Sequence, residues 1–184
     1  MGLDLDKTFF VIWTTTTWTL PGNLAICLGP DYEYTVVKAN GENYIMAAEL
    51  VKPTMEAAKI ENYTTEGSFT GKELEYMKAA HPFMGRDSLV IVGDHVTLES
   101  GTGCVHTAPG FGVDDFEVCK KYPEIGIVVP VDAKGIQTAE AGKYAGLSTT
   151  DSNKIIAKDL EESGALFALE KIVHQYPHCW RCKN

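Results

Sequence analysis

Strong turn signals divide the first third of the chain into short runs rich in β-branched and aromatic residues. Pro21-Gly22-Asn23 and Gly29-Pro30-Asp31 interrupt any regular element, and Asn40-Gly41 is a pair preferred in tight hairpins. Runs of this length are typical of strands, because a helix normally needs a longer uninterrupted periodic segment. The pattern therefore excludes a helical bundle for this part of the chain and predicts a sheet of short strands.

The same signals predict the remaining elements. We expect strands over residues 7–14, 32–39, 42–47, 88–92, 95–98, 126–131 and 165–174, and helices over residues 71–80, 114–122 and 151–163. The last of these helices is the clearest, since Asp151 or Ser152 can cap it and Gly164 ends it. Strands and helices do not alternate regularly. The predicted fold class is mixed α and β, with a twisted, β-barrel-like core and two or three peripheral helices.

Charge and cysteine usage limit the partners and the compartment. The formal net charge is −9, whereas a domain that grips a phosphate backbone along its surface is normally basic. A pocket for one nucleotide end stays compatible with this acidity. No apolar run reaches membrane-spanning length, and Asp4 and Asp6 stand where a signal peptide would be basic or apolar. The odd count of five cysteines fits a reducing compartment, so we expect a cytoplasmic protein without a membrane partner.

A threonine-rich peptide is the first candidate for a binding site. Four consecutive threonines stand between Trp13 and Trp18 and are followed by Thr19-Leu20-Pro21. Each hydroxyl can donate and accept a hydrogen bond, and the two indoles can wall a pocket or stack on a base. Threonine also favours strands, so an ordinary edge strand is the alternative.

A glycine-rich segment over residues 101–116 is the second candidate. His106 lies nine residues before Asp115, across a turn that contains Pro109-Gly110, and Asp114 and Asp115 open an expected helix. A carboxylate in such a place can hold an ammonium group through charge-assisted hydrogen bonds. The segment is not a dinucleotide fingerprint, because it lacks the Gly-x-Gly-x-x-Gly pattern. A buried structural histidine and plain turn chemistry are the alternatives.

Cys179 and Cys182 form a Cys-x-x-Cys pair near the end of the sequence. A tetrahedral zinc site normally needs a second pair, and the sequence contains no other. His174 and His178 offer a compact alternative ligand set whose spacing is too tight for a comfortable tetrahedron. We therefore interpret the pair as half of a zinc site, empty in this chain and completed only in a larger parent protein. No other cofactor is expected.

These three segments together resemble the editing domain of isoleucyl-tRNA synthetases, an insertion in the catalytic fold of those enzymes. The family shows Trp-Thr-Thr-Thr-Pro-Trp-Thr-Leu-Pro, then Gly-Thr-Gly-x-Val-His-x-Ala-Pro leading to an acidic pair. This chain matches the first motif over residues 13–21 at every position except residue 17, and the second over residues 101–115. Residues 176–183 are similar to the segment that rejoins the synthetase body. The valyl and leucyl enzymes carry Thr-Thr-Arg-Pro in the first motif. The resemblance implies an editing domain over residues 1–175 and the start of the return segment over residues 176–184.

The resemblance also implies an activity. An isoleucyl enzyme must reject valine, and this family is itself the standard example of how little a missing methylene contributes, about 1–3 kcal/mol. The implied reaction is hydrolysis of valine from isoleucine tRNA, with the 3′ aminoacyl-adenosine end as substrate and the rest of the synthetase in cis as partner. A monomer with weak, salt-dependent binding of whole tRNA is expected. A binding module without hydrolysis, a free-standing editing protein and a structural spacer are the alternatives.

Site residues are carried over from the matching motifs. Asp115 would bind the substrate ammonium group, and His106 would meet the aminoacyl side chain or the terminal ribose. Water would attack the ester with ordered hydroxyls and no strong side-chain base, or with His106 as general base. The remaining positions assigned to catalysis or substrate contact are Thr14, Thr15, Thr16, Trp18, Gly103 and Thr107.

Two positions depart from the family pattern. Thr17 stands where the family usually has proline, which adds a backbone donor and loosens a fixed φ. Phe111 stands where many members have a second histidine. Both changes lie inside the motifs that define the expected pocket.

Overall fold

A computed structural model describes residues 4–170 and residue 181, and its strands form two four-stranded sheets. The first sheet has the order β1 (Thr8–Phe10), β4 (Glu42–Ala47), β3 (Glu33–Ala39) and β5 (Thr64–Thr70). The second has the order β6 (Lys78–Ala80), β7 (Asp87–Val92), β2 (Ala25–Leu28) and β8 (Cys104–Thr107). Both sheets mix parallel and antiparallel pairs, which follows from the irregular order of elements along the chain.

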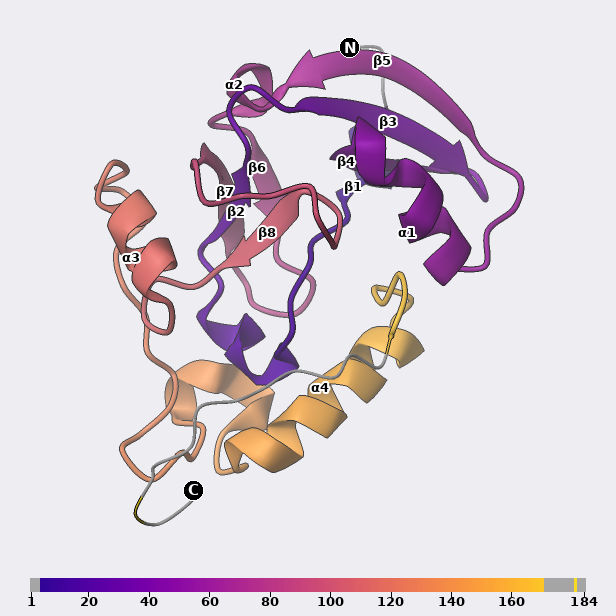
Figure 1. The fold of residues 1–184 in the computed structure, drawn as a ribbon. Helices are drawn as coiled ribbons and strands as arrows, with labels where there is room; N and C mark the ends of the chain where they lie inside the picture. Colours follow the sequence, from indigo (N-terminus) through magenta and orange to yellow (C-terminus); the bar gives the residue numbers. More distant parts are fainter. Residues whose placement is uncertain (1–3, 171–180, 182–184) are drawn as a thin grey trace.

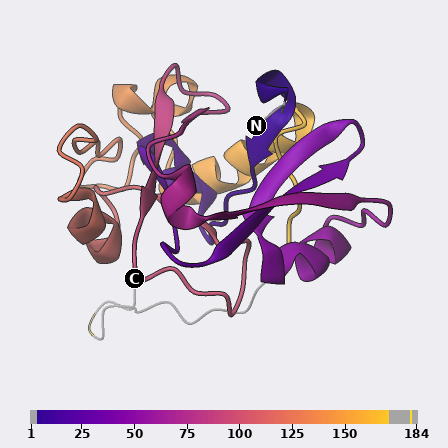
Figure 2. The same cartoon turned by 90° about the horizontal axis from the view of Figure 1, so that it is seen from above.

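Short helices surround the sheets (Figures 1 and 2). The α-helices are α1 (Val51–Ala57), α2 (Gly71–Leu74), α3 (Val113–Cys119) and α4 (Thr149–Glu162). The 3₁₀ turns are η1 (Leu5–Lys7), η2 (Thr17–Gly22), η3 (Ala48–Leu50) and η4 (Ala139–Tyr144). In Figure 1, α1 lies beside the first sheet, α3 lies at the opposite side of the molecule, and α4 lies below the indigo turn that contains η2. None of the helices in this described part is long and apolar enough to cross a membrane.

The core lies where the two sheets face each other. Apolar side chains from both sheets form one buried cluster, in which Ile26 and Leu28 of the second sheet meet Val36 and Ile45 of the first. Burying these branched side chains contributes about 1.5–3 kcal/mol each. The sheets do not close into a barrel, yet the mixed α and β class with a barrel-like core is confirmed.

Several sequence predictions are confirmed. The hairpin β3–β4 turns at Asn40 and Gly41, whose φ angles of 55° and 83° are the pair that a type I′ turn requires. Helix α4 covers nearly the predicted range and is followed by Gly164 with a φ of 76°. Its N-cap is Ser148, whose hydroxyl accepts from the Asp151 N–H, so the expectation of Asp151 or Ser152 as cap was wrong.

Other predicted elements are shorter than expected or absent. The strand expected over residues 7–14 ends at Phe10, and the helix expected over residues 71–80 ends at Leu74. Residues 95–98, 126–131 and 165–170 form no strand. Residues 126–131 have no ladder partner beyond a single bridge at Val131, so an apolar run alone did not make a strand. Residues 171–174, and the expected domain boundary after residue 175, lie outside the described residues.

Candidate active site

The threonine peptide runs alongside β8 in the structure. The Trp13 N–H donates to the Cys104 carbonyl at 2.8 Å, and the His106 N–H donates to the Trp13 carbonyl at 3.0 Å. These two bonds make a short parallel bridge between segments that lie about ninety residues apart in the sequence. The bridge therefore brings the peptide and His106, which the sequence assigned to two separate motifs, to one place.

The threonine hydroxyls bind one another and one backbone carbonyl. Thr14 Oγ1 donates to the Thr16 carbonyl at 3.0 Å and accepts from the Thr16 N–H at 3.2 Å. Thr19 Oγ1 donates to the same carbonyl at 2.9 Å. Because that bond uses the Thr19 proton, the contact between Thr16 Oγ1 and Thr19 Oγ1 at 3.2 Å takes its proton from Thr16. Thr15 is exposed and belongs to none of these bonds.

His106 is buried, and both of its ring nitrogens have partners. Asn23 Nδ2 lies 2.7 Å from His106 Nδ1, and Thr19 Oγ1 lies 3.0 Å from His106 Nε2. The Asn23 amide nitrogen also donates to the Ala25 carbonyl, which assigns the orientation of the amide and makes His106 Nδ1 an acceptor. The proton therefore resides on Nε2 and is donated to Thr19. Burial lowers the pKa of His106 to about 4, with a smaller contribution from His81.

Asp115 is tied to the end of the same strand. It lies in the first turn of α3, and its Oδ2 accepts from the Ala108 N–H at 2.7 Å, two residues beyond His106. Partial burial raises the pKa of Asp115, while the hydrogen bond from Ala108 and the nearby His95 imidazole act in the opposite direction. The structure thus joins His106 directly to the threonine peptide, and joins Asp115 to the backbone two residues beyond His106.

Trp18 and Phe111 make an edge-to-face contact, with ring centroids 5.1 Å apart and an interplanar angle of 79°. Phe111 also packs against Gly22, because a Cβ added at Gly22 would lie 2.6 Å from the Phe111 ring. Phe111, one of the two departures from the family pattern, therefore supports Trp18 and the end of η2.

Gly103 and Thr107 are placed differently from the other predicted site residues. Gly103 is buried with a φ of 75°, and a Cβ there would be 2.5 Å from the Ala47 side chain. Its carbonyl accepts from the Tyr34 hydroxyl at 2.7 Å. Thr107 is fully buried, and its hydroxyl donates to the Val105 carbonyl in its own strand. Both residues hold the backbone of β8 in these contacts.

Sequence reasoning missed several side chains that build the site. Asn23 was interpreted only as part of a turn, and Thr19 only as part of the motif over residues 13–21. Asn153 and Gln137 bind the backbone of residues 17 and 18 from distant parts of the chain, and no sequence signal indicated this.

The cysteines of the described part are thiols in the core. Cys27, Cys104 and Cys119 are buried and unbridged, and burial raises the pKa of Cys27 to about 12. No cluster of three or more metal-ligating side chains occurs among residues 4–170 and 181. Cys179 and Cys182, the proposed half site for zinc, lie outside the described residues.

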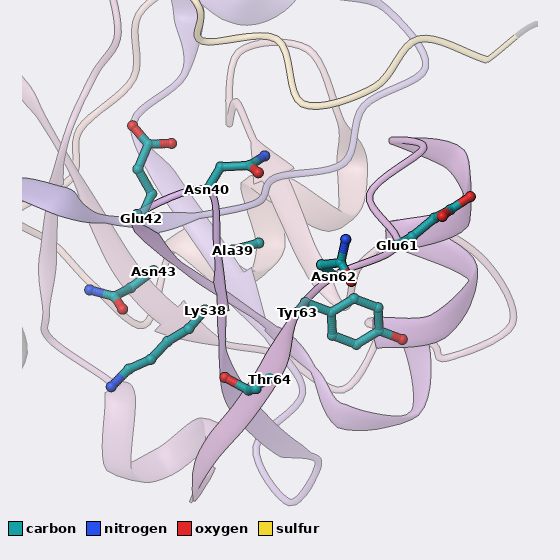
Figure 3. A pocket seen from close by; sticks show the side chains of 10 residues that line it. Lys38, Ala39, Asn40, Glu42, Asn43, Glu61, Asn62, Tyr63 and Thr64 are labelled. Atoms are coloured by element: carbon teal, nitrogen blue, oxygen red, sulfur yellow. The ribbon is translucent and has the colours of Figure 1, made fainter.

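One hollow on the surface lies away from these residues. It measures about 690 Å³ and opens between the β3–β4 turn and the segment that leads into β5 (Figure 3). Lys38, Asn43 and Tyr63 are among the residues that line it. Lys38 is already paired with Glu66. None of the predicted site residues contributes to this hollow, so it is not the candidate active site.

Solved structures share this architecture. The chain matches the crystal structure of GlLeuRS-CP1 with a TM-score of 0.71 and 15% identity, over 92% of this chain and 84% of that one. It matches the editing domain of the cytosolic leucyl-tRNA synthetase of P. falciparum with a TM-score of 0.65 and 13% identity, over 84% of this chain and 77% of that one. At these identities the likeness shows the fold alone, which is that of these leucyl-tRNA synthetase domains.

Sequence comparison shows the family. Residues 3–171 match the family model described as leucyl-tRNA synthetase, editing domain, and the chain belongs to that family. It is 61% identical to the isoleucine–tRNA ligase of Caldicellulosiruptor bescii over 97% of this chain and 19% of that protein. It is 50% identical to the isoleucine–tRNA ligase of Thermoanaerobacter sp. over 98% of this chain and 19% of that protein. The chain thus spans about a fifth of the length of these relatives.

Proposed function

We propose that this chain is the editing domain of an isoleucine–tRNA ligase and hydrolyses valine that has been attached in error to isoleucine tRNA. The observation that carries the proposal is the linked set of Thr14, Thr16 and Thr19 hydroxyls, joined to a neutral His106. Asp115 is anchored two residues beyond that histidine, through Ala108. The high identity to isoleucine–tRNA ligases supports the choice of amino acid.

The Asp115 carboxylate would receive the α-ammonium group of the aminoacyl ester. The hydrogen bond from Ala108 fixes the direction of this carboxylate before the substrate arrives, and such pre-orientation lowers the cost of binding. Ion pairing would lower the pKa of Asp115 and favour its charged form. Trp18, supported by Phe111, would form an apolar wall of the pocket.

The threonine hydroxyls would order the attacking water. Since Thr16 Oγ1 donates its proton to Thr19, its lone pairs would serve as acceptors for a water O–H. The water oxygen would attack the ester carbonyl carbon, and the bond to the ribose oxygen would break. One water proton passes to that leaving oxygen, so the products are valine and tRNA with free terminal hydroxyls.

His106 is poorly suited to act as the general base. Its pKa of about 4 lies far below neutrality, and its Nδ1 lone pair is already used by Asn23. These facts support a mechanism in which water attacks without a strong side-chain base. A rate that is flat between about pH 5.5 and 8 is expected of both mechanisms, because an imidazole with a pKa of about 4 is unprotonated over that range. His106→Gln separates them, since a loss of about 10²–10⁴-fold is expected if His106 is the general base and a smaller loss if it is not.

The decisive experiment measures deacylation of valyl- and isoleucyl-tRNA, both on isoleucine tRNA. The wild-type chain should release valine selectively, Asp115→Ala should abolish release, and Asp114→Ala should leave it unchanged. Asp114 is the matched control because it is exposed in the same turn of α3. Equal rates on both esters, or no turnover by a folded wild-type chain, would contradict the proposal.

A non-hydrolytic binding module is the second candidate. The acidic charge of the chain, −9, favours recognition of the tRNA 3′ end alone, with the tRNA body on other parts of a synthetase. We propose that the chain is a cytoplasmic monomer that binds whole tRNA weakly and with a strong dependence on salt concentration. We also propose that a zinc ion at Cys179 and Cys182 would require ligands from outside this chain. Binding of the aminoacyl-adenosine end without turnover by the wild-type chain would favour the module.

A further inference from the structure

The N-terminus of η2 lacks a cap from its own segment. The residue at the cap position, Thr16, makes no side-chain cap hydrogen bond, although the first N–H groups of a helical turn need acceptors. Asn153 supplies the acceptor from α4. Its Oδ1 accepts from the Thr17 N–H at 2.8 Å and from the Trp18 N–H at 3.3 Å. Because two backbone donors face it, the atom at this position must be the amide oxygen.

Thr17 strengthens this contact with its side chain. Its hydroxyl lies 2.6 Å from the Asn153 carbonyl oxygen and 2.8 Å from Asn153 Oδ1, and its single proton is donated to one of the two. A second tether lies next to it, where Gln137 Nε2 donates to the Trp18 carbonyl at 2.9 Å and to Ser152 Oγ at 3.3 Å. Residues 17 and 18 are therefore held on α4 by side chains from two distant parts of the chain.

Apolar packing keeps α4 in place against η2. Ile156 and Leu160 of α4 form a buried cluster with Leu20 of η2 and Tyr144. Figure 1 shows α4 directly below the turn that contains η2. Asn153 thus projects from a helix that is itself fixed on the segment it caps.

The cap reaches the threonine hydroxyls through one rigid group. The Thr17 N–H that Asn153 binds and the Thr16 carbonyl belong to the same planar peptide unit. That carbonyl accepts from both Thr14 Oγ1 and Thr19 Oγ1, and Thr19 Oγ1 in turn meets His106 Nε2. Because Asn153 fixes the direction of the Thr17 N–H, it also fixes the direction of the Thr16 carbonyl, which accepts from the hydroxyls of Thr14 and Thr19.

We propose that Asn153 is a positioning residue of the editing site, which acts by fixing the peptide unit between Thr16 and Thr17. The proposal rests on the hydrolytic function proposed above. Asn153 acts only through the backbone of Thr17 and Trp18 and through the hydroxyl of Thr17. Its removal should therefore lower the rate of the chemical step more than the affinity for substrate.

Three variants in helix α4 test this role. Asn153→Ala removes the acceptor, Asn153→Asp keeps an oxygen at the same position, and Lys154→Ala changes an exposed neighbour on the same helix. Asn153→Ala should lower kcat for valyl-tRNA about tenfold or more while KM changes less than about twofold, because misplaced groups mainly affect the transition state. Asn153→Asp should restore most of kcat, and Lys154→Ala should match the wild type.

A second readout does not depend on turnover. Nitrogen-15 NMR of the His106 ring reports whether Nε2 carries the proton and donates it to Thr19. Asn153→Ala should shift the His106 nitrogen signals, while Asn153→Asp and Lys154→Ala should leave them in place. If the wild-type chain does not hydrolyse valyl-tRNA, the proposed function fails and this spectrum still decides the positioning role.

A double-mutant cycle with Thr17 completes the test. Proline fits the backbone here, since Thr16 is extended with φ −137° and ψ 110° and Thr17 is the first residue of η2. Thr17→Pro deletes two of the three donors to Asn153, the N–H and the hydroxyl of residue 17, and leaves the Trp18 N–H. In the Asn153→Ala background it should therefore cause no further loss of kcat. Losses of kcat that add in the double variant would overturn the proposal, as would His106 signals that stay unchanged in Asn153→Ala. It would also be overturned if Asn153→Asp lost as much kcat and as much melting temperature as Asn153→Ala.

Discussion

Asn23 Nδ2 donates to His106 Nδ1 over 2.7 Å, and the same amide nitrogen donates to the backbone carbonyl of Ala25 over 3.0 Å. The amide oxygen of Asn23 accepts from Ser88 Oγ at 2.5 Å, so the whole amide is held by β2 and β7. A strand backbone therefore selects the histidine tautomer. The second sheet, and not the threonine peptide, therefore determines which ring nitrogen of His106 carries the proton.

Replacing Asn23 with aspartate should reverse that tautomer. A carboxylate offers only acceptors, so His106 Nδ1 would have to carry a proton, and the pKa of His106 would rise from its present value of about 4. Nitrogen-15 NMR of the imidazole across pH 4–8 measures both effects, and Asp114→Asn controls for a remote change of charge. An Nε2–H tautomer retained in Asn23→Asp would contradict the assignment.

The low pKa of His106 predicts an acid-labile fold. Because His106 titrates near pH 4 when folded and near 6.5 when unfolded, the unfolded chain binds more protons between these values. The stabilisation is complete above about pH 6.5 and is lost as the pH falls toward 4, at up to roughly 1 kcal/mol per pH unit for this group. Denaturant unfolding at several pH values should show a shallower slope in His106→Gln.

His81 provides the comparison for this measurement. Burial also lowers its pKa to about 4, and its Nε2 contacts the Leu20 carbonyl. His81→Gln should flatten the pH dependence by a similar amount. Asp115, whose pKa is raised, acts with the opposite sign, and its contribution cancels when each variant is compared with the wild type. An unchanged slope in both variants would mean that neither imidazole is buried in its neutral form.

Some secondary-structure elements could be predicted from the local sequence, and others could not. Local signals sufficed for the β3–β4 turn, where Asn40 and Gly41 carry their own conformational preference, and for α4, whose apolar periodicity is clear. Strand β2 was missed because Ala25–Leu28 is only four residues long and is fully buried, so it shows no alternation. Its identity as a strand depends on β7 and β8, which lie far away in the sequence.

The candidate site, too, could be predicted from the sequence only in part. The motifs located Thr14, His106 and Asp115, but the groups that orient them come from elsewhere. Asn153 is separated from Thr17 by 136 positions, and its role depends on how α4 packs on η2. A single sequence contains no signal for such a contact. Residues 126–131 show that a clear local signal can also mislead. Their apolar run predicted a buried strand, yet Ile127 is 58% exposed.

Phe111 should control the width of the proposed pocket through Trp18. Phe111→Ala would remove the edge-to-face contact, worth about 0.5–1.5 kcal/mol beyond burial, and allow the indole to move. The preference for valyl over isoleucyl ester should then fall by about tenfold, the scale of one methylene. Phe111→Tyr keeps the ring and should keep the preference. Deacylation rates on the two esters measure it, and an unchanged ratio in Phe111→Ala would exclude Phe111 from the wall.

Gly103 should act through packing, and Gly41 provides a matched control. Both residues have positive φ angles, 75° and 83°, but a Cβ at Gly41 would meet nothing within 4 Å, whereas one at Gly103 would lie 2.5 Å from Ala47. Gly41→Ala should therefore cost only the backbone strain, about 1–2 kcal/mol. Gly103→Ala should cost about 1–3 kcal/mol more, from overpacking between the sheets.

Denaturant unfolding of both glycine variants measures the difference. Adding Ala47→Gly to Gly103→Ala removes the atom that the new Cβ would strike, and should recover part of the stability by the coupling expected of residues in contact. If Gly103 serves only the fold, the rescued double variant should also deacylate valyl-tRNA at nearly the wild-type rate. Restored stability with lost hydrolysis would instead assign Gly103 to substrate contact, because the two effects would then have separated at a single position.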